Sequence, residues 1–233
     1  MKKATKIQSN FLDFNIPFVI PKRSRGSVEC QCKCTFKAVV ANGKYLNPLD
    51  FISFLSPHAN AVCDSSTLQA ISKDIVKSAQ LTALSIKVEL LYFIDRVSPT
   101  FKPVNYGLPS YFESIFVNYK WFSNIGIQLP VRVKDVSVTA GELDYKLINH
   151  NSQHFEDLLE HVQYTTGFKL YPMACQDDEN AIQGVIDKGK QPYEYLVDMQ
   201  KRVTDKKYAK GGAVSLTIPD LYNMYKFNYK VNW

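Results

Sequence analysis

The sequence predicts an α+β protein built as two similar modules, each with antiparallel strands and with helices packed on one sheet face. Two patterns predict this fold class. Several stretches alternate apolar and polar side chains with a period of two, as half-buried strands do. Others place apolar side chains at helical spacing behind a residue that can cap a helix. The length of 233 residues allows one large domain or two fused modules of ordinary size.

The composition indicates a globular, intracellular protein. Its five cysteines have no framework of disulfide spacings, which favours a reducing, cytoplasmic compartment. The N-terminal lysines precede no apolar run, and no apolar run reaches membrane-spanning length, so we expect neither a signal peptide nor a membrane partner. The net charge is +6, but outside short clusters at 22–25 and 206–210 the basic residues are interleaved with acidic ones. We therefore do not expect a nucleic-acid partner.

The first predicted strand, residues 27–40, carries Cys30, Cys32 and Cys34 at every second position. On a strand these side chains share one face, and neighbouring thiols lie roughly 6.6 Å apart. Two sulfurs bound to one zinc ion must lie within about 4 Å of each other, so one strand cannot chelate zinc with these residues unaided. Because free cysteine packs as a small hydrophobe, we interpret them as core residues rather than as a metal or redox site.

The rest of the first half is predicted to contain two helices and three strands. Asn42 and Gly43 form a turn dipeptide after the first strand. One helix is expected over 48–59 with a break at Pro57, and a second over 64–80, capped by Asp64, Ser65 or Ser66. Strands are expected at 82–94, 110–122 and 125–133, with a turn at Ser123-Asn124 between the last two.

The second half repeats this mixture. Residues 152–166 form an amphipathic helix capped by Ser152, with His161 on its exposed side. A short strand at 167–172 is followed by a polar loop at 175–191. A helix over 192–207 begins with proline, as helices favour. Two extended segments, 212–221 and 222–233, close the chain.

The last of these segments places aromatic and apolar side chains on one face and lysine and asparagine on the other. It either closes the chain's own sheet or docks by strand addition on a neighbouring subunit or another protein. The candidate interface residues are Tyr225, Phe227, Tyr229 and Trp233.

Several sequence blocks together resemble the type IB GTP cyclohydrolase family, over about residues 17 to 225. YFIDRVSP (92–99) resembles the family's strand-end signature, and LPVRVKD (129–135), NHNSQH (149–154), FKLYP (168–172) and PYEYLVDMQKRV (192–203) follow in the family's order. The resemblance implies a tunnelling fold of two tandem modules that assembles into a homo-oligomeric ring. The modules would span 27–122 and 123–233, after an N-terminal arm at 1–26, with the last strand as an extension of the second module.

Members of that family use a divalent metal to activate water against GTP, at sites between subunits. By resemblance, the metal-binding cysteine falls on Asp135, the ligand histidine on His150 or Asn149, and a second histidine on His154. The ligand glutamate falls on Lys169, whose ammonium offers no lone pair to a metal. We therefore expect no bound metal, and Asp135, His150 and His154 are the weak candidates by resemblance.

Other site positions of the family also differ here. The purine-anchoring glutamate falls on Gly184, and the C-terminal histidine motif on Asn223 and Tyr225. Because the scaffold blocks match and the site blocks do not, the resemblance implies a member that keeps the fold and has lost the reaction. We expect no catalytic residue and no cofactor.

Three hypotheses for the function follow. The first is a catalytically degenerate protein that acts as a structural or assembly component through homo-oligomerisation, alone or with other proteins in a virus particle or cellular machine. The second is an active enzyme with a rebuilt metal site that acts on GTP or a related purine or pterin. The third is a module that binds a nucleotide or pterin.

Overall fold

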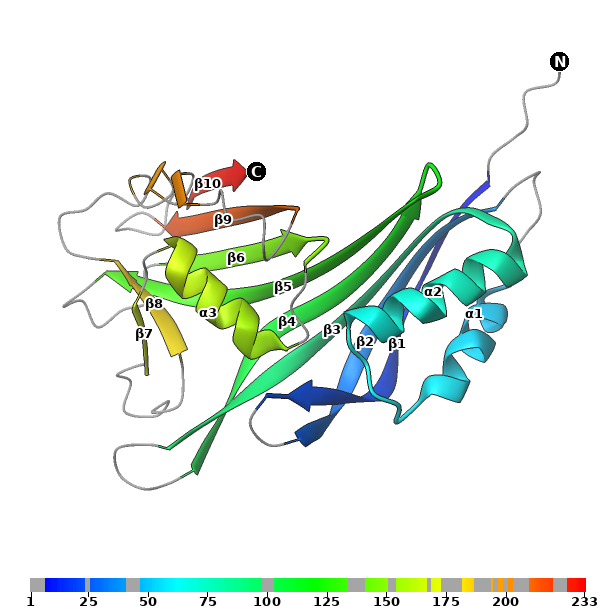
Figure 1. The fold of residues 1–233 in the computed structure, drawn as a ribbon, viewed down its shortest axis with the longest axis horizontal. Coiled ribbons are helices and arrows are strands. Elements are labelled where there is room, and N and C mark those ends of the chain that lie inside the picture. The colour runs from blue at the N-terminus through cyan, green and yellow to red at the C-terminus, as the bar shows by residue number, and fades with distance from the viewer. Residues whose placement is uncertain are drawn as a thin grey trace, which may run out of the picture. The chain divides into compact units, whose positions relative to one another are not determined.

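The computed structural model describes residues 7–23, 26–40, 47–97, 103–133, 141–150, 154–166, 169–172, 182–186, 194, 197–198, 201–202, 210–219 and 226–233. Among them, the strands of one sheet follow the order β1-β2-β3-β4-β5-β6-β9-β10, and β8 pairs with β5 and β7 (Figure 1). The strands are β1 (Ile7–Lys22), β2 (Gly26–Val40), β3 (Leu81–Val97), β4 (Pro103–Val117), β5 (Lys120–Val133), β6 (Gly141–Ile148), β7 (Lys169–Pro172), β8 (Ile182–Ile186), β9 (Gly211–Pro219) and β10 (Lys226–Asn232). The helices are α1 (Pro48–Leu55), the 3-10 turn η2 (Ser56–His58), α2 (Ser65–Ala79) and α3 (Phe155–Thr166).

The strands and helices confirm the α+β fold expected from the sequence, and the chain divides into two compact units. Unit 1 comprises residues 1–90 and 111–125, and unit 2 comprises 91–110 and 126–233. Strands β3, β4 and β5 therefore contribute residues to both units. The predicted module boundary at residues 122 and 123 falls inside β5 and stays a prediction.

In unit 1, helices α1 and α2 lie on one face of the strands (Figure 1). The side chains beneath them include Cys32, Cys34 and Phe36 of β2, all with 0% exposure. Burial raises the pKa of Cys32 and Cys34 to about 12, so both thiols stay protonated near neutral pH. The interpretation as core residues is confirmed for Cys32 and Cys34, whereas Cys30 is only half-buried.

The helices of unit 1 begin as the sequence predicts. The Asp64 carboxylate accepts a hydrogen bond from the Thr67 amide at 2.7 Å and caps α2. Helix α1 is capped by Asn47 and ends before Pro57, where the chain continues as η2. The predicted turn at Asn42-Gly43 lies outside the described residues.

Residues 7–22, which the sequence analysis assigns to an N-terminal arm, form strand β1. This strand pairs with β2 in antiparallel register, for example Phe18 opposite Cys30. A register shift between Phe11 and Phe14 interrupts its alternation of side chains, which explains why the period-two pattern was not recognised.

Unit 2 packs α3 against strands of the sheet. The rings of Tyr92 on β3 and Phe155 on α3 have centroids 4.8 Å apart. Strands β6 and β9 add Leu143, Leu147 and Leu216, each with 0% exposure. Strand β10 pairs with β9 in antiparallel register, so the C-terminal segment is a strand of the chain's own sheet.

Three sequence predictions are wrong. The turn expected at Ser123-Asn124 lies inside β5, because the chain reverses at Asn118-Tyr119 instead. The loop expected over 175–191 contains β8, which pairs with Val131 and its neighbours in β5. The side chain of His161 is buried, with 6% exposure, rather than on the outer side of α3. The proposed Ser152 cap lies outside the described residues.

In the part of the chain that the structure describes, no helix is long and apolar enough to cross a membrane.

Candidate functional site

The candidate metal ligands are not brought together among the described residues. His150 follows β6, and His154 stands immediately before α3; both are half-buried. Asp135 lies outside the described residues, and Lys169 begins β7. Within the described part of the chain, no three His, Cys, Asp or Glu side chains form a group that could hold a metal ion. The expectation that no metal is bound, with Asp135, His150 and His154 only as weak candidates, stays a prediction.

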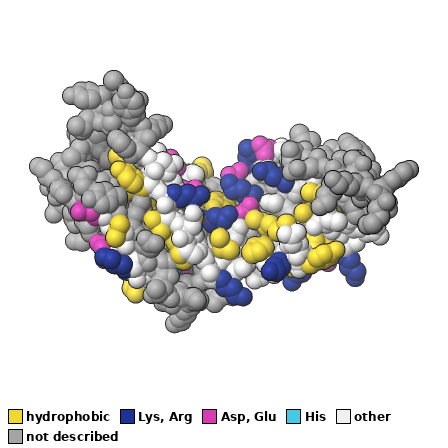
Figure 2. All heavy atoms as spheres, turned by 90° about the horizontal axis from the view of Figure 1, so that it is seen from above, with side chains coloured by type: hydrophobic (Ala, Val, Ile, Leu, Met, Phe, Trp, Pro, Cys, Tyr) yellow, Lys and Arg dark blue, Asp and Glu magenta, His cyan; other side chains and the backbone are white. Residues whose placement is uncertain are grey.

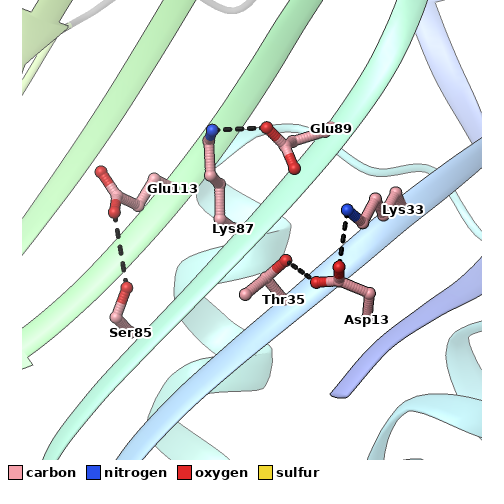
Figure 3. Close-up of polar contacts among 7 residues, drawn as sticks. All are labelled: Asp13, Lys33, Thr35, Ser85, Lys87, Glu89 and Glu113. Carbon is pink, nitrogen blue, oxygen red and sulfur yellow. Dashed lines mark hydrogen bonds and ion pairs between the residues drawn. The ribbon is translucent and has the colours of Figure 1, made fainter. Parts of the chain in front are cut away.

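The sheet of unit 1 has a polar face opposite the helices, where side chains from four strands meet (Figure 3). It consists of Asp13 on β1, Lys33 and Thr35 on β2, Ser85, Lys87 and Glu89 on β3, and Glu113 on β4. These residues alternate along each strand with the buried core residues, so the alternation of the strands places them on the other side of the sheet. We call this set the polar face.

Charges on the polar face are paired with each other. The Asp13 carboxylate lies 2.6 Å from Lys33 Nζ and accepts a hydrogen bond from the Thr35 hydroxyl at 2.6 Å. These two contacts lower the pKa of Asp13, with Lys33 as the larger cause. A carboxyl that is held ionised does not suit proton transfer near neutral pH.

The remaining members of the polar face are also engaged. Lys87 Nζ lies 2.5 Å from Glu89 and 4.5 Å from the centre of the Tyr111 ring. The Glu113 carboxylate accepts hydrogen bonds from Asn124 at 2.8 Å and from Ser85 at 3.4 Å. Figure 2 likewise shows basic side chains beside acidic and hydrophobic ones on the face in view. Such a surface suits polar contacts with another protein better than binding of a highly charged ligand.

Unit 2 contains a buried polar cluster that the sequence analysis missed. The Tyr145 hydroxyl lies 2.8 Å from His161 Nδ1 and 2.8 Å from Thr165 Oγ1, and Thr165 donates to the His161 carbonyl at 2.7 Å. Burial raises the pKa of Tyr145, so its hydroxyl stays protonated and can donate. All these groups are satisfied when His161 donates to Tyr145 and Tyr145 donates to Thr165. The one available signal was the alternation in GELDYKLI, which forms β6.

The C-terminal Trp233 packs beside this cluster. Its ring centre lies 5.9 Å from that of Tyr145. Its backbone exchanges two hydrogen bonds of 3.1 Å with Gly212. A methyl group added to Gly212 would meet the Trp233 indole, and would lie 2.7 Å from the Lys146 carbonyl oxygen. The glycine thus leaves the space that the indole occupies.

Strand β10 is the last strand of the sheet order. Its register with β9 shows which of its backbone groups lie on the outer edge. Gly212 and Trp233 form a hydrogen-bonded pair, so alternate residues along the pairing point their backbone groups toward β9. The backbone amides and carbonyls of the other residues point away from β9: these residues are Lys226, Asn228, Lys230 and Asn232. We call this row the β10 edge.

The predicted interface residues have different surroundings. Tyr229 is half-buried and stands opposite Leu216, while Trp233 packs on its own chain. Phe227 pairs with Ile218 through its backbone, and Tyr225 lies outside the described residues. Tyr229 and Trp233 therefore lie on the side of the sheet that carries Leu216, and Asn228, Lys230 and Asn232 lie on the other.

Comparisons with known proteins give the fold. No protein-family model and no curated protein matches the chain. The uricase of Arthrobacter globiformis has a similar structure, with a TM-score of 0.58 and 8% identity, over 98% of this chain and 93% of that chain. A urate oxidase from Bacillus sp. TB-90 has a TM-score of 0.50 and 7% identity, over 98% of this chain and 100% of that chain.

The chain has a tunnelling fold. The fold that the sequence resemblance implied is therefore confirmed, but the family was wrong, because the similar structures are urate oxidases rather than type IB GTP cyclohydrolases. Most residues of the GTP cyclohydrolase site were absent from the matched sequence blocks, so the blocks carried the fold and not the family. At 7–8% identity the similarity establishes the architecture and no activity.

Proposed function

We propose that this tunnelling-fold protein is a structural component that assembles with copies of itself through the β10 edge. The observation that carries the proposal is the row of outward backbone amides and carbonyls from Lys226 to Asn232. An unpaired strand edge is a template for another strand, and proteins usually protect or use such edges. Pairing with a second copy satisfies these groups by strand addition.

The side chains of the β10 edge support pairing in water rather than burial. Asn228, Lys230 and Asn232 are exposed, and the Ser215 hydroxyl lies 2.7 Å from the Asn228 side-chain oxygen. Strand addition buries mainly the backbone, so these side chains keep their contact with solvent on the polar side of the sheet.

The electrostatics of unit 1 support a structural role over catalysis. Each acid described on the polar face has a hydrogen-bonding or charged partner, and the hydrogen bonds to Asp13 lower its pKa. Catalytic acids and bases instead need a pKa near the working pH. The proposal has two further parts. The chain has lost a former activity, and it belongs to a larger assembly such as a virus particle.

The rival function is binding or turnover of a purine such as urate, since the similar structures are those of urate oxidases. The two functions differ in their response to dilution and to ligand. Sedimentation velocity from about 0.1 to 50 µM protein should show a discrete oligomer if the β10 edge is used. A chain that stays monomeric throughout contradicts the proposal. Thermal stabilisation by urate, in a protein that does not associate, favours the rival.

A further inference from the structure

The hairpin between β4 and β5 has an uncommon turn (Figure 1). Its two central residues, Asn118 and Tyr119, have φ angles of +50° and +60°. A two-residue hairpin of this kind favours Asn-Gly, since glycine adopts a positive φ without a steric penalty. A bulky side chain in the left-handed region costs roughly 1–2 kcal/mol. The chain thus has a tyrosine where glycine is more stable.

The Tyr119 side chain projects from the tip with 92% exposure. Its ring meets the edge of Phe116, with centroids 6.4 Å apart, and Phe116 packs on Trp121 at 4.7 Å. Phe116 is itself only 8% exposed, so a packed aromatic base supports the exposed ring. Val117, at 38% exposure, and the exposed Lys120 flank it. We call these three residues, Val117, Tyr119 and Lys120, the hairpin tip.

Helix α1 in the same unit has an exposed apolar face. Leu49 and Ile52 are 65% and 39% exposed and stand three residues apart, so they lie on one side of the helix. Leu55 is fully buried and fixes the orientation of the helix against unit 1. Asp50, in the first turn, is also exposed. A short helix that is apolar on its outer side is typical of an interaction surface.

We propose that the hairpin tip of one copy docks on helix α1 of a second copy, with Tyr119 against Leu49 and Ile52, and Lys120 facing Asp50. The two surfaces match in chemistry, since each combines apolar groups with one charge of opposite sign. They cannot cover each other within a chain that leaves both Tyr119 and Leu49 exposed. Because the two patches differ, the contact is either reciprocal across a two-fold axis or head-to-tail, as in rings.

This inference rests on the proposed self-assembly and names a second contact within it. In this contact, the strained backbone at Tyr119 holds a large rigid ring at the tip of the hairpin. An aromatic anchor at this place gives the most contact for the least loss of side-chain entropy. Both surfaces belong to unit 1, so the contact involves no site between the two units.

The test is Tyr119→Gly, compared with wild type by sedimentation velocity and thermal unfolding. We expect an equal or higher melting temperature, because strain is relieved, together with association at least tenfold weaker. Lys120→Glu and Asp50→Lys should each weaken association, and the double variant should restore it. This rescue excludes a loss caused by local unfolding of α1.

The outcomes separate this contact from the proposed function. A Tyr119→Gly protein that associates like wild type overturns the hairpin contact and leaves assembly through the β10 edge intact. A wild type that is monomeric overturns both. A third outcome is that wild type binds phosphatidylcholine–phosphatidylserine vesicles, that Tyr119→Gly does not, and that both form the same oligomer. This result assigns the tip to a lipid surface and also overturns the contact.

Discussion

The two strands that end the sheet order, β1 and β10, differ in how their outer edges are protected. In β1, backbone groups of Pro17 and Val19 pair with residues 60–63: Asn60 donates to Pro17, Val19 donates to Ala61, and Cys63 donates to Val19, at 2.8–2.9 Å. Pro17 and Pro21 remove donors from the same row. No described residue covers the β10 edge in this way.

This difference is the reason for proposing the β10 edge, rather than the edge of β1, as the site of assembly. Prolines, bulges and covering segments commonly prevent edge-to-edge pairing of strands. The C-terminal half of β1 has prolines and a covering segment, and its bulge lies farther toward the N-terminus. Strand β10 is instead fixed in place by Trp233 and keeps a regular row of donors and acceptors. Among the described residues, Gly212 and Trp233 hold β10 in place while its outer edge stays uncovered.

The largest effect is expected from deleting residues 226–233. The deletion exposes β9 and removes the Trp233 ring from Tyr145, so apolar side chains of unit 2 become accessible. We expect the melting temperature to fall by about 10 °C or more, with aggregation and loss of the oligomer. Calorimetry and light scattering measure both. A truncated protein with unchanged stability and mass would show that β10 is dispensable.

Gly212→Ala should have the next largest effect, because it disturbs the anchor of β10 without touching the edge. The added methyl group conflicts with the Trp233 indole and with the Lys146 carbonyl, and such overpacking costs about 1–3 kcal/mol. Urea unfolding measures the loss. Asn232→Ala, on the exposed side of β10, is the control and should leave stability unchanged. Equal stability of the two variants would mean that Trp233 does not anchor the strand.

Tyr145→Phe should have a smaller effect on the same region. It removes the hydroxyl between His161 and Thr165 and leaves a buried ring nitrogen with one contact fewer, at a cost of about 1–3 kcal/mol. Tyr164→Phe, an exposed tyrosine on α3, is the matched control. If both variants unfold at the same urea concentration, the cluster does not stabilise the packing beneath Trp233.

The smallest effect is expected on the protected edge. Pro17→Ala with Pro21→Ala restores two backbone donors on β1, but residues 60–63 already occupy part of that edge. We expect an unchanged oligomeric mass and a change in stability below about 1 kcal/mol. A rise in mass would show that the prolines, rather than the covering segment, keep β1 from pairing.

The sequence predicted the regular elements with strong periodicity. Strand β2 and helix α2 agree with expectation within one residue at each end, because alternation and the Asp64 cap are local signals. Strand β1 was missed because of its bulge, and the β4–β5 turn because Asn118-Tyr119 lacks the usual glycine. The Tyr145 cluster could not be predicted, since it joins a strand and a helix through tertiary packing.

The central claim, that copies assemble through the β10 edge, is tested most directly by Lys230→Pro against Lys230→Ala. Both variants lose the ammonium, but only proline removes the outward amide, and that amide has no role in pairing with β9. Sedimentation velocity should show a smaller species or monomer for Lys230→Pro and the wild-type oligomer for Lys230→Ala, with similar melting temperatures. Identical oligomers for both variants would contradict assembly through this edge.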